Sequence, residues 1–280
     1  MRLSCLSNKT NTNMRSETNR ERIRMKNTDF DYKRIAQGYK DRPFLHGQVI
    51  ERFQRDVTDK LFENGLDVGC GAGLSCKALR QICRRVTGAD ISSEMIAAAQ
   101  ELYQDLHGYT FLVSRAEEIP AVEEKYDIVT AAGVIPWVEK EDFLRNLRQI
   151  ICTRGYVLIY DFGISDQMRD NTDYSLWWHE KYLKEFPKPL RNEQVWTKQD
   201  VEPFGFAMLG QVCYDLEYEF DRDAFVRFMM LQSNVNAKIE GEGRDPGEVQ
   251  EWFARSLTPI FGGERRTAVF TGYSWYLMAY

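Results

Sequence analysis

The amino-acid sequence predicts an α/β fold built around a mostly parallel sheet, and three observations lead to it. Short apolar runs recur in the first half of the chain without regular alternation, as expected of strands buried on both faces. Segments of helical period separate these runs, which is the order typical of parallel βαβ units. In the second half, an apolar–polar alternation and a final apolar run indicate further strands.

The apolar runs of the first half are too short for helices and are predicted as strands. They are Gly65–Val68, Val86–Ala89, Phe111–Val113, Tyr126–Thr130 and Tyr156–Tyr160. Apolar residues at helical spacing predict helices between them, with faces formed by Leu74, Ala78 and Ile82, by Met95, Ala99, Leu102 and Leu106, and by Phe143, Leu147 and Ile150. A further helical segment is expected over residues 30–55, interrupted at Arg42-Pro43.

The second half of the chain has a different rhythm. Residues 162–205 are aromatic and charged without a clean strand, whereas residues 212–220 alternate as a strand with one solvated face does. An amphipathic helix around 249–257 and a closing strand over 268–280 follow. Because no repeat or clear boundary appears, residues 27–280 are predicted to form a single domain with insertions at about 162–205 and 221–262.

Composition restricts the function classes. The formal charge of -5 disfavours a nucleic-acid partner, which usually meets a clustered basic face. No apolar run is long enough to span a membrane, so no membrane partner is expected. Six cysteines without a C-x-x-C pair, together with only three histidines, argue against a metal site. The thiols are expected to be reduced, which favours a cytoplasmic protein.

The first 26 residues form a polar leader with seven Arg and Lys and two Glu. No apolar segment follows it, so a secretory signal is disfavoured. The prediction is a disordered tail, or an upstream start with Met25 as the working start. An organelle transit peptide is the alternative, because the leader is rich in arginine and poor in acids.

The clearest functional signal is a glycine-rich loop between the first strand and the helix that follows it. It begins at Asp67 and contains Gly69, Gly71 and Gly73. Small residues allow a tight turn under a ligand, and the helix N-terminus offers free N–H groups. A dinucleotide-binding G-x-G-x-x-G fingerprint would need a glycine where Leu74 stands, so this class is disfavoured. Asp90, at the end of the second strand, can accept both hydrogen bonds from a ribose diol.

With these motifs, the sequence resembles the class I S-adenosylmethionine-dependent methyltransferases, in the small-molecule subgroup of the type 11 and trans-aconitate kinds. The matching stretches are Leu66–Gly73, Gly88–Ser92, Ala116–Pro120, Tyr126–Val129 and Arg154–Ile159, with a looser match at Gly272–Tyr276. The resemblance implies a Rossmann-like, doubly wound sheet of seven strands with an antiparallel last strand and helical lid insertions.

The resemblance also implies S-adenosyl-L-methionine as cofactor, with its methionine part over the loop glycines and its amino group held in part by Asp67. Asp90 would bind the ribose. The implied set of cofactor-binding residues is Asp67, Gly69, Cys70, Gly71, Gly73, Asp90, Ile91, Met95, Ala116, Glu117, Ala132, Tyr39 and Arg42. Arg115 departs from the family, which often has an aspartate there, so that the adenine contact would fall to the backbone of Ala116. Tyr39 and Arg42 match an N-terminal helix that closes over the cofactor.

The partner is expected to be a small-molecule acceptor, bound beyond the carboxyl ends of the strands. Residues 131–137 resemble neither the segment of amino-group methyltransferases nor that of metal-dependent catechol types. His46, Asp161 and His179 are candidates for a base, but no catalytic residue is assigned. Arsenic methylation is disfavoured because cysteine pairs are lacking. A non-catalytic cofactor-binding protein of the same fold is the alternative function.

Aromatic residues of the second half are candidates for the roof of an acceptor pocket. They are Tyr174, Trp177, Trp178, Trp196, Trp252 and Phe253. The alternative is that they pack insertions onto the sheet. Because a displacement reaction needs a dry site that still opens, residues 27–45 and 165–200 are predicted to form a mobile lid.

Overall fold

The computed structural model describes residue 38 and residues 42–188 and 194–280. Within these ranges the chain forms one seven-stranded sheet with the strand order β3-β2-β1-β4-β5-β7-β6. The strands are β1 (Phe62–Val68), β2 (Cys83–Asp90), β3 (Tyr109–Val113), β4 (Tyr126–Ala132), β5 (Ile151–Met168), β6 (Phe206–Phe220) and β7 (Arg266–Ala279). β7 runs antiparallel to both of its neighbours, and the five strands from β3 to β5 are mutually parallel. The predicted fold class is confirmed.

Helices follow the strands in the predicted order. The α-helices are α2 (His46–Asp56), α3 (Leu74–Leu79), α4 (Ser93–Tyr103), α5 (Lys140–Ile150), α6 (Thr172–Trp177), α7 (Leu183–Glu185), α8 (Lys198–Val201), α9 (Arg222–Met229), α10 (Ser233–Asn236) and α11 (Pro246–Phe261). Shorter turns are the 3₁₀ segments η4 (Ile135–Trp137) and η6 (Glu202–Phe204) and the π-helical segments η5 (Trp178–Tyr182) and η7 (Ala237–Gly241). Capping side chains fix where several helices begin. The side chains of Ser92 and Asp245, for example, accept a hydrogen bond from the first turn of α4 and of α11.

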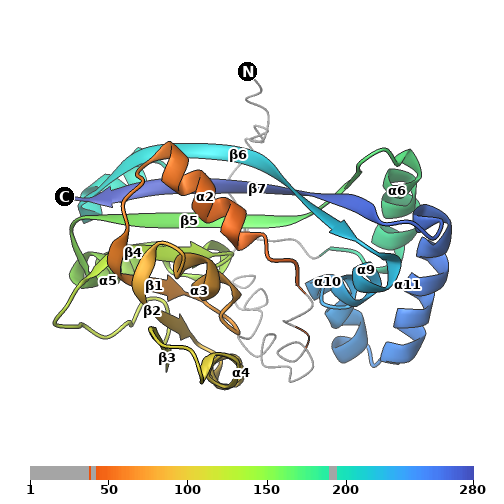
Figure 1. Cartoon of the computed structure of the whole chain (residues 1–280), viewed down its shortest axis with the longest axis horizontal. Helices are drawn as coiled ribbons and strands as arrows, with labels where there is room; N and C mark the ends of the chain where they lie inside the picture. Colours follow the sequence, from red (N-terminus) through yellow and green to blue (C-terminus); the bar gives the residue numbers. More distant parts are fainter. Residues whose placement is uncertain (1–37, 39–41, 189–193) are drawn as a thin grey trace, which may run out of the picture.

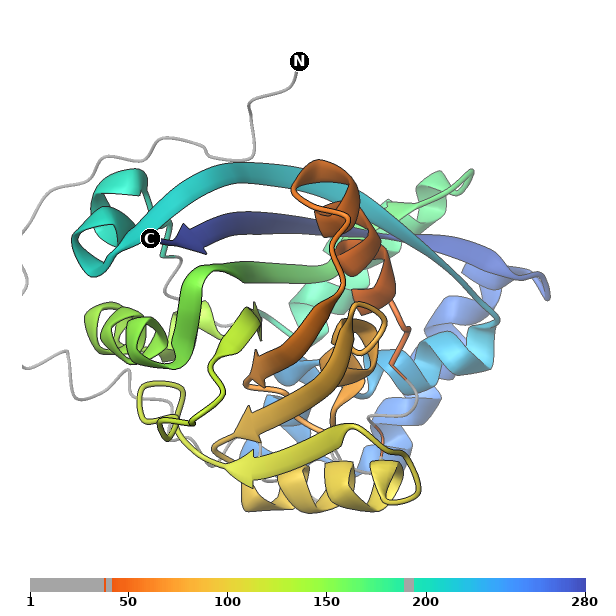
Figure 2. The same cartoon turned by 60° about the vertical axis from the view of Figure 1, so that its left-hand side comes forward.

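Three strands are much longer than the rest and extend beyond the others at one end of the molecule. Figure 1 shows β5, β6 and β7 crossing the whole molecule, with α6, α9, α10 and α11 gathered at their far end. Figure 2 shows β1, β2 and β3 fanning out below β5, while α2 lies across the long strands. The helical insertions therefore stand on the same end of the sheet as the carboxyl ends of β4 and β5.

The core has two layers, one on each face of the sheet. Leu158 and Tyr160 of β5 belong to the cluster that includes α2 and α3, whereas Val157 and Ile159 belong to the cluster with α5. Successive strand residues point to opposite faces, so this alternation places α2 and α5 on opposite sides. The sheet is therefore covered on both faces, as a doubly wound fold requires.

Two expected details were wrong. β5 does not end at Tyr160 but continues to Met168, because antiparallel pairing with β7 satisfies its backbone as far as that residue. The buried face of α4 consists of Met95, Ile96, Ala99 and Tyr103, while Leu102 and Leu106 are exposed. Tyr103 is held inside because its hydroxyl donates to the carbonyl oxygen of Gly73 at 2.8 Å.

Candidate functional site

The loop between β1 and α3 has backbone conformations that favour glycine. Gly69, Gly71 and Gly73 have φ angles of +66°, +52° and +89°. Residues with a Cβ rarely adopt this left-handed backbone region. The turn therefore requires glycine at these three positions. The loop closes on itself through the hydrogen bond from Gly73 N to Cys70 O at 2.9 Å, and it is tied to β2 through Cys70 N and Ala89 O at 3.0 Å.

Asp90 joins this loop to the start of α4. Its Oδ2 accepts from Gly71 N at 2.8 Å, and its Oδ1 accepts from Ser92 N at 2.9 Å. The structure thus brings together Gly71 and Asp90, which lie 19 positions apart in the sequence.

Asp67 lies in the protein interior at the end of β1, next to the loop. Its side chain is fully buried, and it accepts hydrogen bonds from Ser75 Oγ at 2.5 Å and Thr130 Oγ1 at 2.6 Å. Cys76 Sγ lies 3.3 Å from the same carboxylate. The carboxylate is therefore turned into the protein, where it connects β1, α3 and β4 beneath the loop. These bonds anchor the end of β1 beneath the loop, and a contact between Asp67 and the cofactor's amino group stays a prediction.

Burial raises the pKa of Asp67 to about 6, although its hydrogen bonds with Ser75, Thr130 and Cys76 lower it. A folded-state pKa above the unfolded value stabilises the fold at low pH, and this stabilisation is lost as pH rises from about 4 to about 6. Replacing Asp67 with asparagine should remove this dependence. The difference in unfolding free energy between wild type and Asp67→Asn should therefore change by about 3 kcal/mol across that window, at roughly 1.4 kcal/mol per pH unit.

Urea unfolding of both proteins at a series of pH values measures this difference. A constant difference from pH 4 to pH 7 would contradict the assignment of the shift to Asp67. Titrating groups that do not interact with Asp67, His46 among them, act equally in both proteins and cancel in the comparison.

Other residues of the predicted set surround the loop at different depths. Ile91 is 39% exposed at the end of β2, whereas Met95 is a buried core residue of α4. Ala132 is the last residue of β4 and pairs with Tyr160 of β5. Cys70 is buried, and its thiol donates to Gly71 O at 3.4 Å. Ligand contacts of these residues remain predictions.

The segment after β3 is held by the carboxylate of Glu117. Its Oε1 accepts from Glu139 N at 3.0 Å, and Arg115 lies 3.5 Å from its other oxygen. Ala116 is half-buried and packs against the cluster of α5. The side chain of Glu117 thus links the β3 segment to the start of α5, and Arg115 is engaged with Glu117 and Glu118.

The N-terminal closing segment is only partly within the described residues. Tyr39 lies outside them, and Arg42 is half-buried just before Pro43. His46, at the start of α2, lies over the middle of β5: its Nδ1 is 2.8 Å from the hydroxyl of Tyr160, and its ring contacts Phe162 edge-on. Burial, together with the charge of Arg42, lowers the pKa of His46 to about 3, so that its imidazole is neutral at physiological pH.

The three candidate bases lie in different places. Tyr160 O accepts from Gly133 N at 2.8 Å, so His46 and its partner Tyr160 stand beside the carboxyl end of β4. Asp161 is also at this end, and its Oδ1 accepts from its neighbour Phe162 N at 2.8 Å. His179 is exposed on η5 and is paired with Asp166 at 2.8 Å. The geometry brings His46 and Asp161, but not His179, to the end of β4.

The aromatic residues of the insertions form a core rather than a roof. Tyr174, Trp177, Trp178 and Phe253 are buried, and the rings of Trp177 and Tyr182 stack at 5.5 Å. Trp196 belongs to the opposite face, against Phe143 and Trp275. Of the two alternatives for these aromatic residues, the structure therefore favours packing of the insertions over a pocket roof. Ring contacts join α6 to α9 and α11. The lid over residues 165–200, of which 189–193 lie outside the described residues, stays a prediction.

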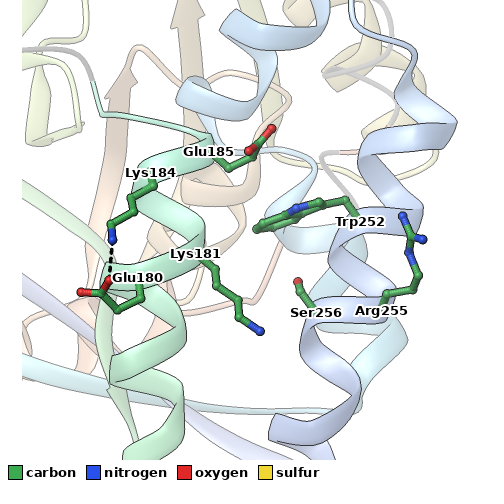
Figure 3. Close-up of a pocket in the computed structure, with 7 residues that line it drawn as sticks. All are labelled: Glu180, Lys181, Lys184, Glu185, Trp252, Arg255 and Ser256. Carbon is green, nitrogen blue, oxygen red and sulfur yellow. Dashed lines mark hydrogen bonds and ion pairs between the residues drawn. The ribbon is translucent and has the colours of Figure 1, made fainter.

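A surface groove of about 470 Å³ lies between η5, α7 and α11, away from the glycine loop. Figure 3 shows Trp252 and Lys181 projecting into the gap between the two helices, with Lys184 joined to Glu180. Apart from Trp252 and Ser256, its lining is charged. Ligand pockets are mostly apolar, so this groove is not a suitable place for a cofactor.

Metal and membrane contacts have separate geometric tests. Within the described ranges, no three His, Cys, Asp or Glu side chains are grouped so that they could hold a metal ion. No helix among the same residues is long and apolar enough to cross a bilayer.

Sequence reasoning missed several residues that build the site. Ser75 and Thr130 hold Asp67, Tyr160 holds His46, and Val134 packs on Gly69. The sequence weakly indicates the contact of Ser75 with Asp67, because a hydroxyl in the first helical turn after the loop lies close to the end of the preceding strand. The others come from β4 and β5, whose distance from the loop in the sequence hides the contact.

Comparisons with known proteins agree with this geometry. Residues 66–159 match the family described as methyltransferase domain. An uncharacterized methyltransferase of Schizosaccharomyces pombe is 31% identical over 133 residues, covering 45% of this chain and 47% of that protein. A ubiquinone biosynthesis O-methyltransferase of Bradyrhizobium diazoefficiens is 30% identical over 121 residues, covering 41% and 47%. The chain thus spans about half the length of these curated relatives.

The fold is shared over a wider range. A proposed type II methyltransferase from Anaeromyxobacter dehalogenans has a solved structure that covers 83% of this chain and 95% of its own, with a TM-score of 0.62 at 21% identity. S-adenosylmethionine is the methyl donor typical of the matched family. The family match covers residues 66–159, and the sheet order and the glycine loop agree with the fold of class I, S-adenosylmethionine-dependent methyltransferases.

Proposed function

We propose that this protein transfers a methyl group from S-adenosylmethionine to a small-molecule acceptor by direct displacement. The observation that carries the proposal is the glycine loop with its hydrogen bond from Gly71 N to Asp90, next to the N-terminus of α3. When bound, S-adenosylmethionine supplies an activated methyl group, so the protein needs to align the acceptor and exclude water.

The site residues fit this cofactor in two respects. The three left-handed glycines leave the loop without a Cβ atom at positions 69, 71 and 73, which allows close approach of a ligand to the backbone there. Asp90 stands at the end of β2 with its carboxylate half-buried, in the position suited to a ribose diol. We propose that the loop glycines and Asp90 hold the cofactor. The other proposed contacts are Asp67, Cys70, Ile91, Met95, Ala116, Glu117, Ala132, Arg42 and, outside the described residues, Tyr39.

The acceptor is proposed to lie beside the carboxyl end of β4 and the adjoining middle of β5, where His46, Tyr160 and Asp161 are found. His46 is neutral at physiological pH and fixed by Tyr160, so it can give or receive a hydrogen bond to an acceptor. The relative from Bradyrhizobium diazoefficiens is named as an O-methyltransferase, which places oxygen acceptors first in a screen. Nitrogen and carbon acceptors stay open.

Titration calorimetry tests cofactor binding directly. We expect micromolar affinity for S-adenosylmethionine or S-adenosylhomocysteine, about -8 kcal/mol, and no binding of NAD. Tight binding of NAD without binding of either methionine derivative would overturn the proposal.

A screen against a metabolite library then tests the chemistry, with mass spectrometry to detect products that have gained one methyl group. Cofactor binding without any product across oxygen, nitrogen and carbon acceptors would favour a non-catalytic cofactor-binding protein. Product formation would exclude that alternative.

A further inference from the structure

The first glycine of the loop lies against a side chain from the end of β4. A Cβ placed on Gly69 would stand 2.4 Å from Cγ2 of Val134, and 3.7 Å from its Cβ. The first distance is far below van der Waals contact, whereas the second is ordinary contact. One methyl group of Val134 therefore fills the space that a side chain at position 69 would need.

Val134 is itself held firmly in place. It is 8% exposed and belongs to the cluster that includes α5. On one side Gly133 N donates to Tyr160 O at 2.8 Å, and on the other Val134 O accepts from Trp137 N at 2.9 Å in the turn η4. Gly133 is left-handed, with a φ of +68°, so the chain turns sharply just before Val134. The position of this side chain is therefore set by β5 and η4.

These contacts form a continuous connection across the site. Tyr160, which binds His46, holds the backbone of Gly133, and the next residue supports Gly69 of the cofactor loop. A void in place of the Val134 methyl groups would leave Gly69 without support on this face, because packed interiors lose contacts outright where atoms are missing. The loop would then have a wider range of positions before ligand binding.

We propose that Val134 is a positioning residue for the cofactor loop, and that its side chain sets the place of Gly69 before S-adenosylmethionine binds. This inference rests on the proposed function. It requires no contact between Val134 and the cofactor.

The first test compares two buried valines of the same segment. Val138 is 5% exposed and lies in the same core cluster, at the end of η4 rather than against the loop. We expect Val134→Ala to weaken the affinity for S-adenosylhomocysteine by about threefold to tenfold, whereas Val138→Ala should leave it within about twofold of wild type. Melting temperatures of the two variants show whether they lose similar stability, so that affinity is compared at matched stability.

The second test is a double-mutant cycle that uses the 2.4 Å contact. Gly69→Ala should lower the affinity for S-adenosylhomocysteine by about 100-fold or more, from the clash and from the left-handed backbone. Val134→Ala removes the clashing methyl group, so the double variant should regain at least about tenfold. Val138→Ala should not rescue Gly69→Ala.

A matched glycine provides the last control. A Cβ on Gly73 would meet Tyr103 Cε2 at 2.8 Å and not Val134. The loss of affinity in Gly73→Ala should therefore remain when Val134→Ala is added.

Rescue confined to the pair of Gly69 and Val134 supports the proposal. Wild-type affinity in Val134→Ala, or equal rescue by Val138→Ala, would overturn it while leaving the proposed function intact. If Gly69→Ala fails to fold, the comparison of Val134→Ala with Val138→Ala still decides. Failure of the wild type to bind S-adenosylhomocysteine would overturn the proposed function, and this inference with it.

Discussion

Replacing Gly71 with valine is expected to abolish binding of S-adenosylmethionine. Gly71 has a φ of +52°, and its N–H is bonded to Asp90 at the centre of the loop. A β-branched residue in the left-handed region is strained by about 1–2 kcal/mol or more, and its methyl groups would occupy the space beside the loop. We expect a loss of at least about 100-fold in affinity for S-adenosylhomocysteine by calorimetry, which corresponds to about 2.7 kcal/mol.

Gly163→Val is the matched control. Gly163 lies in β5, has no heavy atom within 4 Å of a built Cβ, and does not have a positive φ. A valine is favoured in a strand, so this variant should fold and bind as wild type does. If Gly71→Val retained wild-type affinity with an intact fold, Gly71 would have no place in the site.

Asp90→Ala should weaken cofactor binding by about 1.5–3 kcal/mol, the usual range for hydrogen bonds to a charged group. Two effects add in this variant. The proposed bonds to a ribose diol are lost, and Gly71 N loses the acceptor that holds the loop at 2.8 Å. Asp90→Asn keeps one carbonyl oxygen and should be weaker than wild type but stronger than Asp90→Ala.

Asp127 offers a control for the structural part of this effect. Its carboxylate also accepts from two backbone N–H groups, those of Glu63 at 3.0 Å and Asn64 at 2.9 Å. These bonds lie at the amino end of β4, opposite the loop, because Tyr126 begins that strand. Asp127→Ala should therefore lose stability without losing affinity for S-adenosylhomocysteine. Equal losses of affinity in the two alanine variants would show that Asp90 acts on the fold alone.

The order of strands and helices along the chain and the position of the glycine loop follow from local patterns of residues. These signals are local, because strands buried on both faces produce uninterrupted apolar runs and a tight turn under a ligand demands glycine at fixed spacing. Asp90 was found for the same reason, since it ends a recognisable strand. The helix α11 likewise follows from the spacing of Val249, Phe253 and Leu257, which are all buried.

The orientation of the functional side chains depends on contacts between elements that are distant in the sequence. The Asp67 carboxylate is turned inward because Ser75 and Thr130, on two other elements, bind it there. The aromatic residues of the insertions pack with α9 and α11, so that they form a core instead of a roof. The contact between Gly69 and Val134 joins the ends of two adjacent strands that are far apart in the sequence. Such contacts depend on which strands are neighbours in the sheet, and this pairing leaves no pattern in the residues of either strand taken alone.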